Sequence, residues 1–162
     1  MLSGDTMELH KIPFMNKEEY DSLIKDGYVS RIAFKGEYPY IAPFLYVFDG
    51  SFLYFLSTKY GKKVKLLNED PQVAVEIECY HPDMSHFRFV TLQGTINSVV
   101  EEDEKKSVRG MFVDLIKEKE LSPQILAALG HSPEEPLEKI CQEERSYVWK
   151  LVDVQDIVAL KS

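Results

Sequence analysis

The residues whose types and spacing best support chemistry form the short segment STKYGKK at positions 57–63. The segment carries hydroxyl groups at Ser57 and Thr58, a glycine, and the lysine pair Lys62 and Lys63. Because an aromatic, apolar stretch precedes it and apolar residues at helical spacing follow it, the segment joins the end of a strand to the start of a helix. Backbone N–H groups at a helix start, a hydroxyl and lysines together form a binding site for a phosphate. A lysine pair at a surface turn is also a common solvent-exposed feature, so the residues alone leave both interpretations open.

Composition limits the classes of protein that the chain can belong to. With 162 residues, of which 44% are apolar, the chain is long enough for one domain, residues 1–162, with a real core. Its net charge of −8 argues against binding to nucleic acid or to an anionic membrane, since both require excess positive charge. The sequence has no apolar run of membrane-spanning length and no signal-peptide pattern, and Cys79 and Cys141 lie far apart. We therefore expect a cytoplasmic protein with reduced thiols.

The first half of the sequence predicts a helix followed by three antiparallel strands and a second, short helix. After a lead segment at 1–15, Asn16 and Glu19 have the spacing of a capping box for a helix at 17–26. The pair Asp49-Gly50 favours a tight hairpin turn. The predicted strands are 28–34, 38–48 and 52–57, and the predicted second helix is 61–68.

The second half of the sequence adds strands around a helical segment. Strands are predicted at 73–79, 86–99, 147–152 and 157–160, with Gly94 as a bulge or bend, and a helix at 102–118. Ser122 and Ser132 each precede a proline, which predicts two short helices within an insertion at about 119–144. Five to seven strands with helices at the periphery predict a mainly β fold, a closed or split antiparallel barrel of Greek-key-like order.

Three sequence stretches resemble a known family. The segments PYIAPF, DGSFLYFLS and GKKVKLLNEDPQVAVEI, within 38–77, resemble the FMN-binding split-barrel superfamily, which includes pyridoxamine 5′-phosphate oxidase and nitroimidazole-reductase-like proteins. The later segment FRFVTLQGTINSVVEEDEK and the closing strand fit the same pattern. The resemblance covers most of the chain outside 119–144, and it implies a split barrel that binds FMN.

The resemblance also implies roles for particular residues. In that family the segment matching Ile41, Ala42, Pro43 and Phe44 runs along the flavin ring. The oxidase has an arginine at the position of Ile41, so one contact to the phosphate or ribityl chain is missing here or comes from elsewhere.

The resemblance assigns the phosphate to the turn identified above. Its hydroxyl, matching Ser57 with Thr58 beside it, and its basic pair, matching Lys62 and Lys63, bind the ribityl phosphate. The oxidase also binds its substrate phosphate with an Arg-x-His-Asp-Arg segment, and no such segment follows residue 110. We therefore expect a relative of the oxidase that does not catalyse the oxidase reaction.

Candidates for contact with a substrate lie after the fourth predicted strand. His81, His86 and Arg88 could lie over the flavin, because in this family the cleft at the dimer interface receives residues from this region. The alternative is that the histidines are simply exposed and that Arg88 pairs with Glu76 or Glu78 across strands. No histidine spacing indicates a metal site, so no metal is expected.

Aromatic residues suggest a second copy of the chain as the partner. Phe44, Tyr46 and Phe48 face one way at period two, while a second aromatic set faces the other way. If the first set fills the barrel, the second is exposed or covered by a partner, which favours a homodimer with the cofactor at the interface. Trp149 is expected in the core or at an interface.

The function expected from the sequence is that of an FMN-binding oxidoreductase. It would pass electrons from a nicotinamide donor to a small organic acceptor, with the flavin carrying the chemistry. No residue is assigned as a catalytic acid or base. The alternatives are a flavin carrier without catalysis, or a member of the same fold that binds haem or a deazaflavin.

Overall fold

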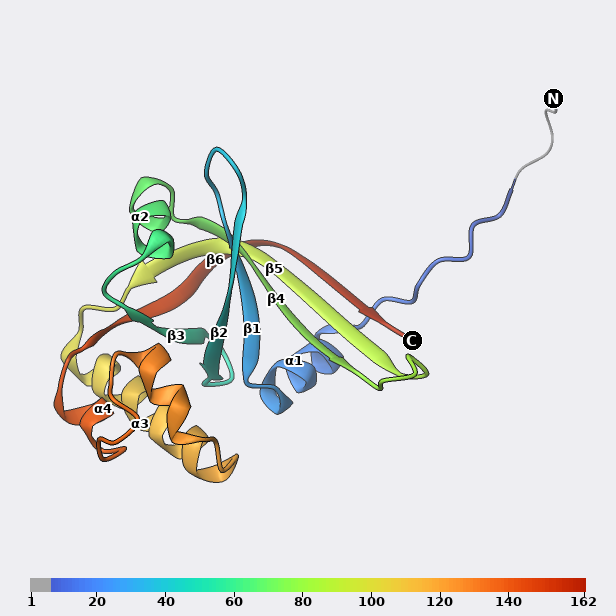
Figure 1. The fold of residues 1–162 in the computed structure, drawn as a ribbon. Helices are drawn as coiled ribbons and strands as arrows, with labels where there is room; N and C mark the ends of the chain where they lie inside the picture. The colour runs from blue at the N-terminus through green and yellow to red at the C-terminus, as the bar shows by residue number, and fades with distance from the viewer. Residues whose placement is uncertain (1–6) are drawn as a thin grey trace.

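An antiparallel β-barrel of six strands forms the centre of the computed structural model, which describes residues 7–162 (Figure 1). The strands are β1 (Val29–Phe34), β2 (Tyr40–Phe48), β3 (Leu53–Thr58), β4 (Gln72–Tyr80), β5 (Phe87–Ser98) and β6 (Ser146–Lys161). The helices are α1 (Lys17–Asp26), α2 (Lys62–Glu69), α3 (Glu102–Glu118), the 3₁₀ helix η1 (Pro123–Leu129) and α4 (Lys139–Gln142). The prediction of a mainly β barrel with peripheral helices is confirmed.

The strand order shows how the barrel closes. Around the barrel the order is β1-β2-β3-β6-β5-β4, so two three-stranded meanders pair through β3 with β6 and through β1 with β4. β3 and β4 follow one another in the chain but are not neighbours, and α2 lies in the crossover between them. This crossover places the lysine-rich segment at one end of the barrel (Figure 1).

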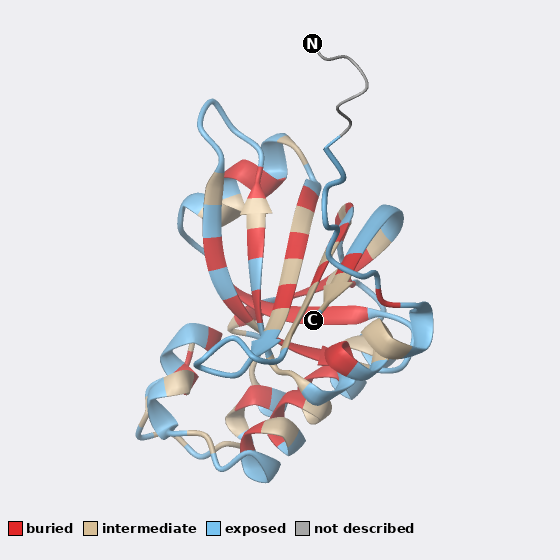
Figure 2. Ribbon diagram, turned by 90° about the vertical axis from the view of Figure 1, so that its right-hand side faces the viewer, coloured by how far each residue is buried: buried red, intermediate tan, exposed pale blue. Residues whose placement is uncertain are grey.

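Alternating side chains of β2 show why these residues fold into a barrel. Ala42, Phe44 and Tyr46 point into the barrel and are at most 8% exposed, together with Trp149 of β6, which is 1% exposed. The ring centroids of Phe44 and Trp149 lie 5.7 Å apart. Buried positions recur along the strands in Figure 2. Trp149 is therefore a core residue, which was one of the two placements predicted for it.

The outer face of β2 and β3 is covered from within the same chain. Val47, Tyr54 and Leu56 pack in a second apolar cluster with Phe112 of α3 and Leu129 of η1. All six residues of β3 are buried, so helices cover one face while the barrel interior covers the other. The aromatic residues Tyr54 and Phe55 of β3 therefore need no partner chain for their burial, and they do not indicate a homodimer.

The first helix packs on the barrel and begins with the predicted capping box. The Asn16 side chain accepts a hydrogen bond from the Glu19 backbone, and the Glu19 side chain accepts one from the Asn16 backbone, which confirms the capping box. The Tyr46 hydroxyl donates to the Ile24 carbonyl oxygen over 2.7 Å and so joins α1 to the barrel. Of the predicted lead segment, residues 1–6 lie outside the described part, and Phe14 forms a bridge with Leu160.

The last strand differs from its prediction. Residues 147–152 and 157–160 belong to one continuous strand, β6, rather than to two strands. The pairing of β5 with β6 shifts register at Gly94, and Asp153 has a φ of 50°. A Cβ atom at Gly94 would lie 2.8 Å from the Val152 carbonyl oxygen, so the glycine permits the close approach of the two strands. The irregularity bends β6 without ending it.

The insertion contains one of the two short helices that Ser122 and Ser132 predict. Ser122 caps η1, and Gly130 ends it with a φ of 87°. Ser132 begins only a turn, because Pro136 disfavours helical geometry at Glu135. The next helix, α4, begins at Lys139.

None of the helices in the described residues is both long and apolar enough to cross a membrane.

Replacing Tyr46 with phenylalanine should destabilise the fold. The change leaves the buried Ile24 carbonyl oxygen without its partner, which costs about 1–3 kcal/mol of the free energy of unfolding. Urea unfolding followed by circular dichroism measures the loss. The matched control is Tyr38→Phe, since Tyr38 is 78% exposed. Equal stability of the Tyr46 and Tyr38 variants would contradict a structural role for this hydrogen bond.

Candidate functional site

The barrel opens between β2 and β3. In the described residues these strands pair only from Tyr46↔Phe55 to Phe48↔Leu53. The first half of β2 continues to pair with β1, while β3 continues along β6 as far as Thr58. The two strands therefore diverge, and the divergence exposes the edge of β2 that includes Ala42 and Pro43.

A hollow of about 420 Å³ lies in this opening. Ala42, Pro43 and Phe44 line it from β2, and Thr58 lines it from β3. The other lining residues are Val29, Tyr40, Leu45, Leu56, Tyr60, Lys63, Ile125, Ala127, Ala128 and Leu129. Most of these side chains are apolar, and η1 contributes one wall. The insertion thus covers part of the hollow.

Lys63 brings a positive charge to the mouth of the hollow. Its Nζ atom donates to Thr58 Oγ1 over 2.7 Å and to the Tyr60 carbonyl oxygen over 3.3 Å. No carboxylate of residues 7–162 forms an ion pair with Lys63. Burial lowers the pKa of Lys63 from its usual value of 10.5, because desolvation disfavours the charged form. An anion beside Nζ would offset that cost.

The start of α2 adds backbone donors beside Lys63. Gly61 precedes the helix with a φ of 105°, a conformation that favours glycine, and no side chain caps the helix. The first N–H groups of the helix are thus available to an anion. Lys62 lies on the same turn, with Nζ 5.1 Å from the centroid of the Tyr40 ring.

The structure brings together part of the predicted cofactor site. Of the segment matching the flavin ring, Ala42, Pro43 and Phe44 line the hollow, whereas Ile41 is 61% exposed and lies outside its lining. Of the phosphate residues, Thr58 and Lys63 line the hollow.

Ser57 and Lys62 lie outside the lining of the hollow. The Ser57 hydroxyl is fully buried and donates to the Thr58 carbonyl oxygen. Neighbouring strand residues face opposite ways, so Thr58 rather than Ser57 faces the hollow. Tyr60 and η1 also line the hollow, although neither was predicted to be part of the site. The approach of η1 to β2 is a contact between distant segments, and no local signal predicts it.

The predicted substrate-facing residues lie elsewhere in the chain. His81, His86 and Arg88 line a separate hollow of about 510 Å³ at the tip of the β4–β5 hairpin, far from α2 (Figure 1). His81 Nδ1 lies 2.7 Å from an Asp83 carboxylate oxygen. Within one chain these residues cannot contact a ligand in the hollow beside β2.

The alternative pairing considered for Arg88 is wrong. Arg31 of β1 forms the ion pairs with Glu76 and Glu78. In the register of β4 with β5, Arg88 lies opposite Cys79, whereas Glu78 lies opposite Phe89. Arg88 therefore points to the other face of the sheet from the two carboxylates.

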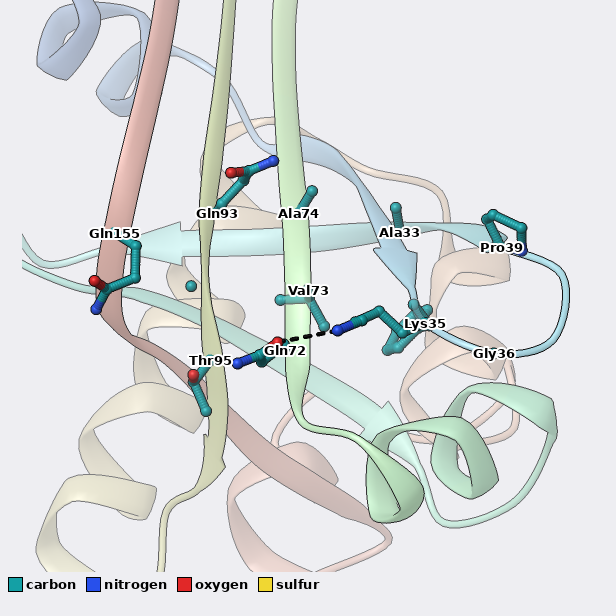
Figure 3. A pocket seen from close by; sticks show the side chains of 12 residues that line it. Ala33, Lys35, Gly36, Pro39, Gln72, Val73, Ala74, Gln93, Thr95 and Gln155 are labelled. Carbon is teal, nitrogen blue, oxygen red and sulfur yellow. Dashed lines mark hydrogen bonds between the residues drawn. The ribbon is translucent and has the colours of Figure 1, made fainter.

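A third hollow, of about 570 Å³, lies on the outside of the barrel (Figure 3). Gln72, Gln93, Thr95 and Gln155 line it, and Lys35 donates to Gln72 Oε1 over 3.1 Å. Lys35 also forms an ion pair with Asp70, at 3.3 Å. This hollow is larger than the one beside β2, but its one lysine is already paired with a carboxylate. It is the weaker candidate for a phosphate-bearing cofactor.

Among residues 7–162, no three His, Cys, Asp or Glu side chains lie together as ligands for a metal ion.

Comparison with known families identifies the chain. The sequence profile of the family described as pyridoxamine 5′-phosphate oxidase matches residues 16–138. The chain belongs to the pyridoxamine 5′-phosphate oxidase family. This family membership confirms the resemblance inferred from the sequence. Comparison with curated proteins gave no significant match.

Solved structures share the fold over almost the whole chain. An FAD-binding protein from Mesorhizobium loti superimposes with a TM-score of 0.69 at 14% identity, covering 93% of this chain and 98% of that one. A putative 5-nitroimidazole antibiotic resistance protein from Bacteroides thetaiotaomicron gives 0.63 at 14% identity, with coverage of 96% and 95%. The heme storage protein HutZ from Vibrio cholerae gives 0.65 at 11% identity, with coverage of 90% and 94%.

The side chain of Lys63 should have a pKa below the ordinary lysine value of 10.5. The charged form, and with it the attraction for an anion, is present below the pKa and is lost as pH rises through it. NMR titration of the lysine side-chain signals measures the midpoint, with the signal assigned by Lys63→Arg. Binding of an anion should raise the midpoint, because the anion favours the charged form. A midpoint at or above 10.5 in the free protein would contradict the burial of this amine.

Proposed function

We propose that this protein binds FMN in the hollow between β2 and β3 and acts as an oxidoreductase on a small organic acceptor. The observation that carries the proposal is Lys63, a partly buried amine at the start of α2, beside a mainly apolar hollow, with no carboxylate partner in residues 7–162. A flavin joins an apolar ring system to a phosphate. The lining of the hollow matches both parts, and a volume of about 420 Å³ is in the usual range of ligand pockets.

Different residues of the chain would bind the ring system and the phosphate of the flavin. Ala42, Pro43 and Phe44 would hold one side of the ring, and η1 would exclude water from the other. Lys63, the first N–H groups of α2 and the Thr58 hydroxyl would hold the phosphate. When bound, the flavin supplies the redox chemistry, accepting electrons from a nicotinamide donor and passing them on.

We extend the proposal to a homodimer with the cofactor at the interface. The supporting observation is the exposure of Val29, which lines the hollow, and of Ile41, which lies outside its lining, at 45% and 61%. A second copy of the chain would cover these side chains. His81, His86 and Arg88 could reach a bound cofactor only from that second copy, which makes dimerisation a condition for their predicted role.

The comparisons favour a redox cofactor and leave two candidates. The fold is shared with FAD-binding and heme-storage proteins. Haem iron requires an axial ligand such as His, Cys, Met or Tyr. Of these, only Tyr40 and Tyr60 are among the described residues that line the hollow, and no histidine, cysteine or methionine is. The free cation at the phosphate position favours flavin over haem.

Replacing Lys63 with glutamine should weaken FMN binding by about tenfold or more, because the change removes a charge-assisted contact to the phosphate. Titration of apo protein with FMN, followed by quenching of flavin fluorescence, measures the dissociation constant. Lys65→Gln is the matched control, since Lys65 is an exposed lysine of the same helix outside the hollow. Equal affinities of the two variants would refute the assignment of Lys63 to the phosphate. A Soret band in the purified protein would show that the bound cofactor is haem rather than flavin.

The flavin-loaded protein should oxidise NADH or NADPH when a small organic acceptor is present. Stopped-flow absorbance at the flavin band follows reduction by the nicotinamide and reoxidation by each acceptor. Light scattering after size exclusion measures the mass of the assembly. Binding of FMN without any turnover would show that the protein is a flavin carrier rather than an enzyme. A flavin-loaded protein with the mass of a monomer would refute the proposed dimer interface.

A further inference from the structure

A compact, basic cavity of about 210 Å³ lies on the other side of the β3–α2 loop from the cofactor hollow. The loop, the first turns of α3 and the start of β6 meet there. Its charged lining residues are Lys59, Lys105, Arg109 and Glu144, so three cations face one carboxylate. No residue predicted to bind the cofactor is among the lining residues. In a chain of net charge −8, this local excess of positive charge requires an explanation.

Arg109 is the unusual member of this cavity, because it is a buried cation that forms no direct ion pair within residues 7–162. The residue is 3% exposed. Its Nη1 donates to Ser146 Oγ over 2.9 Å, and its Nη2 donates to the Ser146 carbonyl oxygen over 2.8 Å. Glu144 and Glu102 act on the guanidinium from beyond ion-pair distance and offset only part of the cost of burying it. A guanidinium remains charged in a protein. The fork has further N–H groups that Ser146 does not use.

The other two cations also line the cavity. Lys105 Nζ lies 2.8 Å from Glu144 Oε1 and 2.9 Å from Glu102 Oε1. Its two carboxylate partners are themselves mostly exposed. Lys59 Nζ lies 5.5 Å from the centroid of the Tyr147 ring and forms no ion pair within the described chain. The Ser146 hydroxyl accepts from Arg109, so its own proton is available to an oxygen of a ligand.

We propose that this cavity is a second anion site, which binds a phosphate group through Arg109, Lys59 and Lys105, with the Ser146 hydroxyl as a further donor. A guanidinium fork with two ammonium groups is the donor set that recognises phosphate oxygens. The small volume accommodates the phosphate group and leaves the remainder of any larger ligand outside. The occupant is therefore inorganic phosphate or the phosphate end of a small metabolite. The site is separate from the proposed flavin phosphate at Lys63.

The structure places the second site next to the cofactor hollow. Thr58 lies opposite Ser146 in the pairing of β3 with β6, so one residue pair joins a lining residue of each site. Thr58 and Tyr60 line the hollow, while Lys59 between them lines the cavity.

Isothermal titration with inorganic phosphate, in a phosphate-free buffer and on the flavin-loaded protein, tests the proposal. We expect one saturable site, and Lys59→Gln and Lys105→Gln should each weaken it by about tenfold. Lys65→Gln is the control for loss of one positive charge from an exposed lysine and should leave the affinity unchanged. Arg109→Lys keeps the charge but loses the fork. Because Lys59 is exposed, its variant should fold normally even if Arg109→Lys does not.

Lys63→Gln separates the two sites. It should weaken FMN binding and leave phosphate binding in the cavity unchanged, so failure of either proposal can be recognised by itself. Ribose 5-phosphate that binds more tightly than inorganic phosphate would identify a phosphorylated metabolite as the occupant, and equal affinity would identify free phosphate. The absence of saturable binding to the unaltered protein would overturn the second site, as would equal affinities of the Lys59, Lys105 and Lys65 variants.

Discussion

The end of the pairing between β2 and β3 at Tyr46 is the constraint on which the rest of the structure depends. If these strands stayed paired, the barrel would be closed and filled by its own side chains. Their divergence is possible because β3 keeps a partner in β6 up to Thr58, while β2 keeps a partner in β1 back to Tyr40. The barrel thus stays closed elsewhere while one seam opens. The candidate cofactor hollow is this seam.

The helices compensate for the open seam. A strand that leaves its neighbour exposes apolar side chains and an unpaired edge. α3 covers Val47 and Tyr54 on the paired part of the two strands, and η1 covers the part where they diverge. The buried Arg109 donors join α3 to the start of β6 at Ser146, and so fix the helix against the strand next to β3. Both helices therefore stabilise the outer face of the barrel, and η1 also forms one wall of the hollow.

Local signals predicted the elements well, because they act over few residues. The capping box at Asn16 and Glu19, the turn at Asp49-Gly50 and the helix at 102–118 were each read from neighbouring residues. Pro43 is a further local signal, and it marks the edge of a strand. A proline lacks an N–H group and is tolerated at a strand edge, and Pro43 lies in the part of β2 that faces the open seam.

The positions that sequence reasoning missed depend on orientation and distant contacts. Ser57 and Thr58 both carry hydroxyls, and only the register of β3 decides that Thr58 faces the hollow. Ile41 lies outside the hollow although both its neighbours line it. The wall formed by η1 joins residues about 80 positions apart in the sequence, which no periodicity reveals. The continuity of β6 depends on Gly94 of another strand.

The loop after β3 also explains how an acidic protein can hold two cationic sites. Thr58, at the end of β3, and Tyr60 line the cofactor hollow, while Lys59 between them lines the basic cavity. The following helix brings Lys63 back to the hollow, with its Nζ 2.7 Å from Thr58 Oγ1. One short loop thereby divides its lysines between two cavities. Because acidic residues elsewhere outnumber the basic ones, the overall charge of −8 hides this division, and the local arrangement rather than the net charge indicates which anions the protein can bind.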